Sequence, residues 1–135
     1  MEEGSLGVEL ACELFDEDSV RYDSELLLSG GIQYITNKEV IICKSRWGAF
    51  YKTPLQDHLE SLGVDTLVFS GCNFPNCPRT SMYEESERDY KIVLAKDALS
   101  GLYEQGIKEL EAIGVIIEET DKFIEVINAL SGYQK

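Results

Sequence analysis

Short apolar runs alternate with amphipathic helical patterns from residue 38 to the end of the chain. The runs at 39–43, 66–70, 91–95 and 115–117 are rich in β-branched residues. Such runs are typical of buried strands, and strands separated by single helices pair in parallel through right-handed crossovers. The alternation therefore predicts an α/β fold with a parallel sheet.

The segments between the strands carry helix start and stop signals. Thr53 is a hydroxyl N-cap before Pro54 at the first helical position, and Gly63 ends the predicted helix 54–62. Further helices are predicted over 5–15, 78–88 and 102–113, whereas residues 16–37 show no pattern that decides their structure. A last helix capped by Thr120 is expected to direct four apolar side chains inward: Phe123, Ile124, Ile127 and Leu130.

The composition narrows the class of protein. With 135 residues, 44% hydrophobic and 27% charged, the chain is predicted to be a single domain spanning 1–135. Its net charge of −13 argues against binding nucleic acid or anionic membranes, and its apolar runs are too short to span a bilayer. The start lacks a basic segment typical of secretion signals, so the four cysteines are expected to be reduced, in the cytoplasm.

A cysteine follows the second predicted strand at the place where ligands bind open parallel sheets. Residues 72–76 turn from this strand into a helix, which places Cys77 at the N-cap before Pro78. Free N–H groups and the helix dipole favour an anion there, so Cys77 is a candidate thiolate nucleophile. The alternative is that Cys77 is a small buried hydrophobic residue.

A lysine directly follows the first predicted strand. The ammonium of Lys44 is therefore expected at the same sheet edge as Cys77, where a cation stabilises a thiolate and can donate a proton. The alternative is a solvated lysine at a strand end. Trp47 and Phe50, on the following loop, are either core residues or the wall of a substrate pocket.

Other polar residues offer weaker sites. Cys72 and Cys77 do not form a zinc site with the single histidine, His58, because about four ligands at workable spacings are needed. The acidic stretch 84–87 is expected to be an exposed helix face.

Several segments together resemble the isochorismatase-like cysteine hydrolases. They are residues 44–55 (KSRWGAFYKTPL), residues 59–71 (LESLGVDTLVFSG), Cys77 with Thr80, and Tyr90 to Asp97-Ala98. The resemblance covers roughly residues 38–130 in register with the predicted strands and helices, and residues 5–14 match the family's preceding helix more loosely.

The resemblance implies a Rossmann-type doubly wound parallel sheet with helices on both faces. It also implies an Asp–Lys–Cys triad in which Lys44 is the catalytic lysine and Cys77 the nucleophile. It implies an oxyanion hole from the backbone N–H groups of Asn73 and Cys77, beside a cis peptide between Cys72 and Asn73. Phe74, with Pro75 and Asn76, replaces the family's small polar residues and is assigned with Trp47 and Phe50 to substrate binding. No cofactor or metal is expected, since no histidine precedes His58.

The family's base is an aspartate at the end of a first apolar strand, which this chain does not contain. The chain thus resembles an N-terminally shortened member, whose open strand edges favour a homo-oligomer. Two functions remain open. One is hydrolysis of a small-molecule amide, ureide or carbamoyl C–N bond, with the aspartate supplied by another chain or an upstream segment. The other is a non-catalytic binding or oligomerisation module.

Overall fold

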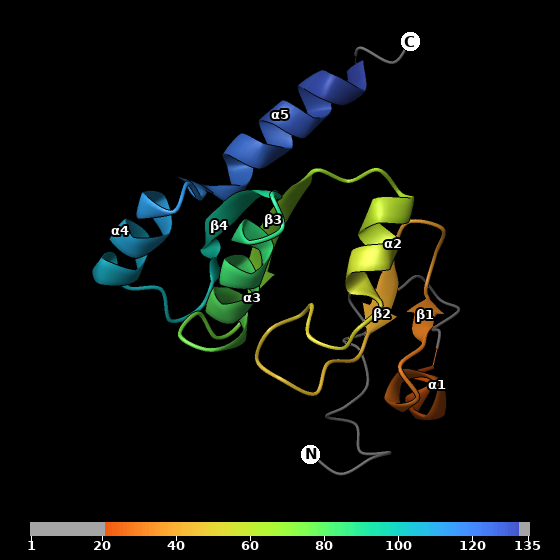
Figure 1. The fold of residues 1–135 in the computed structure, drawn as a ribbon. Helices are drawn as coiled ribbons and strands as arrows, with labels where there is room; N and C mark the ends of the chain where they lie inside the picture. The colour runs from red at the N-terminus through yellow and green to blue at the C-terminus, as the bar shows by residue number, and fades with distance from the viewer. Residues whose placement is uncertain (1–20, 133–135) are drawn as a thin grey trace. The chain divides into compact units, whose positions relative to one another are not determined.

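The computed structural model describes residues 21–132, so the helix predicted over residues 5–15 lies outside the described residues. The chain divides into two compact units, Met1–Cys43 and Lys44–Lys135, and Figure 1 shows the elements of each.

The first unit contains α1 (Ser24–Leu28), β1 (Ile32–Tyr34) and β2 (Val40–Ile42). Asp23 caps α1, because its Oδ1 accepts a hydrogen bond of 2.9 Å from the backbone N–H of Leu26. Helix α1 and strand β1 lie in the segment 16–37, whose structure the sequence pattern left undecided.

The strand predicted over residues 39–43 forms, but its expected place in a parallel sheet is wrong. β2 pairs antiparallel with β1, in a two-stranded sheet of its own, and all three of its residues are half-buried. A short turn connects the strands, with the N–H of Ile35 donating to the carbonyl of Glu39 at 2.9 Å. An apolar run indicates that a strand is buried, but it does not indicate which strand it pairs with or in which direction. The hairpin with β1 decides the pairing of β2.

The second unit contains the predicted parallel sheet, in the order β3 (Thr66–Gly71), β4 (Lys91–Leu99) and β5 (Ile116–Glu118). The central strand is β4, in which the consecutive residues 92–95 are all buried. β3 is not buried on both faces as predicted. Its only partner in the described sheet is β4, and Val68 is 53% exposed.

Four helices belong to this unit: α2 (Leu55–Ser61), α3 (Cys77–Ser86), α4 (Glu104–Ala112) and α5 (Thr120–Gly132). Met82 of α3 and Leu110 of α4 are fully buried against one face of the sheet. The hydrophobic core between these layers consists of Phe74, Met82, Ile92, Leu94, Leu99, Leu110 and Val115. Helix α5 lies toward the other face and leads away from the sheet (Figure 1), so the predicted two-sided α/β architecture is confirmed.

The expectation that α5 buries its apolar side chains is wrong for two of them. Ile124 is 50% exposed and Ile127 is 55% exposed, and the side chain of Leu130 lies outside the described ones. A groove of about 490 Å³ separates α5 from the sheet and is lined by both, including Val68 and Phe123. The helical period correctly predicted an apolar stripe on α5. The described residues nevertheless leave Ile124 and Ile127 of this stripe half exposed.

Candidate functional site

The loop that follows β3 is fastened to the end of β4. The N–H of Phe74 donates to the carbonyl of Ser100 at 2.8 Å, and the N–H of Ser100 donates to Gly71 at 3.0 Å. The peptide bond between Cys72 and Asn73 is cis, as the family resemblance implies. These bonds hold the backbone of Asn73 at the carboxyl end of the parallel sheet.

Cys77 begins α3, one residue earlier than the sequence predicts, because the non-helical backbone of Asn76 makes that residue the N-cap. The Cys77 side chain is half-buried, and Pro78 occupies the next position of the first turn. The N–H groups of Asn73 and Cys77 donate no hydrogen bond within residues 21–132. Two backbone donors are therefore unused beside the cysteine, as expected where a helix begins.

Lys44 turns toward its own loop. Its Nζ donates to the carbonyls of Arg46 at 2.9 Å and Trp47 at 3.1 Å. An ammonium has three N–H groups, so one remains for a further partner.

Two side chains of α3 fasten this loop to the helix that carries Cys77. The Oγ of Ser81 accepts from the N–H of Ala49, and Oε2 of Glu84 accepts from the N–H of Phe50, each at 3.0 Å. The sequence reasoning did not assign these residues a role. Their spacing of four and seven residues from Cys77 places all three on one helix face, which is the signal that predicts them.

A cavity of about 430 Å³ lies where the loop meets the helix, lined by Lys44, Ser45, Arg46, Trp47 and Cys77. Lys44 and Cys77 therefore face a common space, although β2 is no member of the parallel sheet. No carboxylate lines this cavity in the described part of the chain.

The aromatic residues assigned to substrate binding lie in different places. Trp47 is 61% exposed and lines the cavity. Phe50 is buried beside the guanidinium of Arg88, and Phe74 is fully buried, edge-on to Tyr103 at 5.3 Å. Phe50 and Phe74 are therefore core residues that do not line the cavity, because both loops fold these rings inward to cover apolar surface.

The acidic stretch 84–87 is not a uniformly exposed helix face. Glu85 is only 2% exposed, and its Oε2 has no hydrogen-bond partner in the described part of the chain. Burial, and secondarily the charge of Glu84, raises the pKa of Glu85 to about 8. Asp97 of β4 lies outside the cavity and accepts hydrogen bonds from the N–H and hydroxyl of Thr120, both at 2.8 Å.

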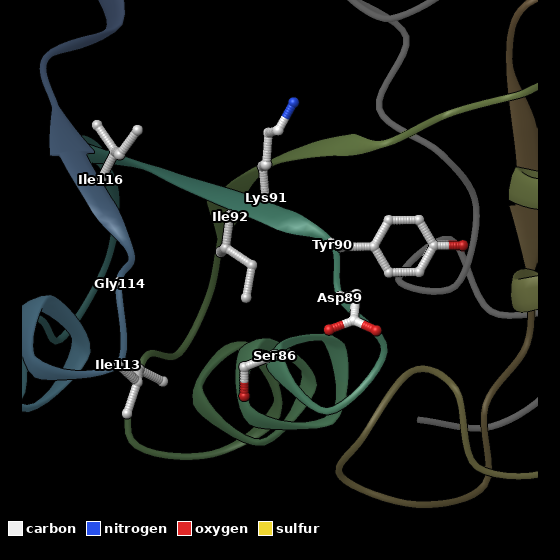
Figure 2. Close-up of a pocket in the computed structure, with 8 residues that line it drawn as sticks. All are labelled: Ser86, Asp89, Tyr90, Lys91, Ile92, Ile113, Gly114 and Ile116. Atoms are coloured by element: carbon white, nitrogen blue, oxygen red, sulfur yellow. The ribbon is translucent and has the colours of Figure 1, made fainter.

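A second cavity of about 330 Å³ lies at the opposite, amino end of β4 and β5 (Figure 2). Two of its polar side chains have partners elsewhere. The hydroxyl of Ser86 donates to the carbonyl of Tyr83, and Lys91 pairs with Asp65 at 3.0 Å. It contains no cysteine, so the cavity beside Cys77 is the stronger candidate for chemistry.

Residues 21–132 contain no cluster of three or more His, Cys, Asp or Glu side chains placed to hold a metal ion. Their helices are all too short or too polar to cross a membrane.

Comparison with known proteins identifies the family of the matching residues. The model of the isochorismatase domain matches residues 31–125. The uncharacterised isochorismatase family protein YecD of Escherichia coli O157:H7 is 31% identical over 96 residues, which are 70% of this chain and 51% of that protein. The ureidoacrylate amidohydrolase RutB of Methylobacterium radiotolerans is 33% identical over 60 residues, 44% of this chain and 23% of that protein.

A solved structure shows the same fold. The isochorismatase family protein from Desulfovibrio vulgaris Hildenborough superimposes with a TM-score of 0.61 at 29% identity, covering 69% of this chain and 51% of that one. The chain thus spans about half the length of YecD and of this structure, and a smaller part of the amidohydrolase.

Proposed function

Because the chain belongs to the isochorismatase family of hydrolases, we propose that it hydrolyses a C–N bond of a small amide, ureide or carbamoyl compound with Cys77 as the nucleophile. The observation that carries this proposal is the cavity shared by Lys44 and Cys77. The unused N–H groups of Asn73 and Cys77 support it further, since an oxyanion needs such donors.

The proposed reaction has two stages. The sulfur of Cys77 attacks the carbonyl carbon, and the oxyanion accepts hydrogen bonds from the N–H groups of Asn73 and Cys77. The C–N bond breaks, the leaving nitrogen takes the thiol proton, and an S-acyl or S-carbamoyl enzyme remains. Water then attacks this thioester, releases the acid and returns a proton to the sulfur. The ammonium of Lys44 stabilises the thiolate in both stages.

Proton transfer to and from the sulfur is the step for which the described cavity offers no carboxylate. We propose that an aspartate from another chain or an upstream segment supplies this base. Loss of a general base costs about 10²–10⁴ in rate, so the 135-residue chain by itself is expected to turn over slowly.

The test is hydrolysis of a panel that includes ureidoacrylate and simple primary amides, followed by ammonia release. We expect Cys77→Ala to abolish the activity and Cys72→Ala to retain it. Cys72 is the matched control, because it is an exposed thiol that precedes α3 and lies outside the cavity. Activity that survives in Cys77→Ala would refute the assignment of the nucleophile.

The second candidate function is a non-catalytic binding or oligomerisation module. The absence of a carboxylate from the described cavity lining favours it. It predicts that compounds bind the cavity without turnover, in the wild type as in Cys77→Ala. Turnover that depends on Cys77 would exclude it.

Self-association is part of both proposals. β3 has one partner in the described sheet and Val68 is exposed, and an open strand edge is a template for pairing. We expect a homo-oligomer in sedimentation, and a stable monomer at micromolar concentration would contradict this. A cytoplasmic location stays a prediction.

A further inference from the structure

The charge of the candidate cavity is opposite to that of the chain. The chain carries 25 acidic and 12 basic residues, yet the cavity lining contains Lys44 and Arg46 and no acidic residue in the described part. In so acidic a protein a cationic recess attracts small anions and concentrates them near Cys77.

Arg46 has unused donors in this recess. Its Nη1 donates to the carbonyl of Ser45 at 3.0 Å, and no carboxylate within residues 21–132 forms an ion pair with it. Arg79 shows the contrast, because its guanidinium pairs with Glu109 at 2.6 Å. A guanidinium has five N–H groups in a planar fork that matches a carboxylate, so Arg46 can bind one with two parallel hydrogen bonds.

Lys44 is less suited to this task. Two of its three N–H groups already donate to the loop carbonyls, which leaves a single donor. Trp47, 61% exposed, offers an aromatic surface next to Arg46 for the short carbon chain of a ligand. The cavity therefore has two ends of different chemistry. Cys77 provides the reacting sulfur at one end, and Arg46 offers free donors for an anion at the other.

We propose that Arg46 is a specificity-determining residue that selects substrates carrying a carboxylate in addition to the hydrolysed amide or ureide. The inference rests on the proposed function for the reaction, and the cavity of about 430 Å³ limits the substrate to a small molecule. Neutral amides of equal size lack the group that Arg46 binds and are poor substrates.

The kinetic test compares succinamate with succinamide, which share the same scissile amide and differ in a carboxylate against a carboxamide. We expect the wild type to prefer succinamate. Arg46→Gln is expected to raise the KM for succinamate about 10-fold to 100-fold, because loss of one hydrogen bond to a charged partner costs this much. The KM for succinamide is expected to stay unchanged. Arg46→Lys restores part of the preference. Lys52→Gln is the matched control, because this cation lies on the same loop outside the cavity.

A binding measurement separates this inference from the reaction. Calorimetry of Cys77→Ala with succinate is expected to show binding that the double variant with Arg46→Gln loses and the one with Lys52→Gln keeps. If no compound is turned over but this pattern holds, the proposed reaction fails and the role of Arg46 stands. An equal rise in the KM for succinamate and for succinamide in Arg46→Gln overturns the inference. Succinate binding that Arg46→Gln leaves unchanged overturns it as well.

Discussion

Glu84 holds the loop that carries Lys44 against the helix that carries Cys77, through a 3.0 Å hydrogen bond from the N–H of Phe50 to its Oε2. The approach is close, because a side-chain carbon at Gly48 would overlap the carboxylate of Glu84. This contact, with the bond from Ala49 to Ser81, connects the two halves of the candidate site.

Removal of this contact is expected to release the loop. Glu84→Ala loses a charged acceptor and lowers the unfolding free energy by about 1.5–3 kcal/mol, whereas Glu84→Gln keeps an acceptor and most of the stability. Trp47 is the single tryptophan of the chain, so acrylamide quenching of its fluorescence reports the loop directly. Quenching should increase in Glu84→Ala. Glu87→Ala, exposed at the C-cap of the same helix, is the control, and equal quenching in both variants would contradict the prediction.

The three described cysteines provide a test of thiol activation. Cys72 is exposed, whereas Cys43 and Cys77 are half-buried, so exposure alone ranks Cys72 as the most reactive toward iodoacetamide. As the proposed nucleophile, Cys77 is nevertheless expected to be alkylated first, because it begins α3 and shares a cavity with Lys44. Mass spectrometry of the modified peptides measures the three rates. If Cys77 behaves as an ordinary half-buried thiol, Cys72 is alkylated first, and this order would contradict the prediction.

Glu85 makes stability depend on pH in an unusual direction. Its pKa is raised to about 8, chiefly by burial, so the folded state holds a proton that the unfolded state releases near its ordinary pKa of about 4.3. Stability is therefore lost as the pH rises from about 4.3 to 8, by at most about 1.4 kcal/mol per pH unit.

Substitution by a neutral isostere should remove this dependence. Glu85→Gln is expected to flatten the decline and to be more stable than the wild type at pH 8, as measured by urea unfolding. Glu87→Gln, exposed at the C-cap of the same helix, should leave the decline as it is. An unchanged slope in Glu85→Gln would show that other groups cause it.

Asp97 is expected to stabilise the start of α5. The hydrogen bonds from the N–H and hydroxyl of Thr120 lower the pKa of this carboxyl. Its contribution is therefore present above its unfolded pKa of about 3.9, and it is lost as the pH falls through the lower folded value. In Asp97→Ala, hydrogen exchange of the first-turn amides of α5 should accelerate at pH 7, and less so in Asp97→Asn, which keeps an acceptor. Asp121→Asn, exposed in the same turn, should have little effect.

Local patterns were sufficient to predict which helices and strands form in the second unit of the chain. Apolar runs and helical periods predicted β3, α3, β4, α4, β5 and α5, with end points within a few residues except at β4, which extends to Leu99. The start of a helix after a strand likewise predicted Cys77 at an exposed edge of the sheet, because helix starts and strand ends depend on residues close in sequence.

Contacts between residues far apart in sequence decided the rest. The apolar run that contains β2 reads as a buried parallel strand, yet its antiparallel partner is set by the preceding hairpin. The ring of Phe74 lies in the core rather than in the cavity, and Glu85 is buried without a partner among the described residues. Composition and periodicity determine which elements form, but burial and pairing depend on which surfaces meet, and only the tertiary structure determines that.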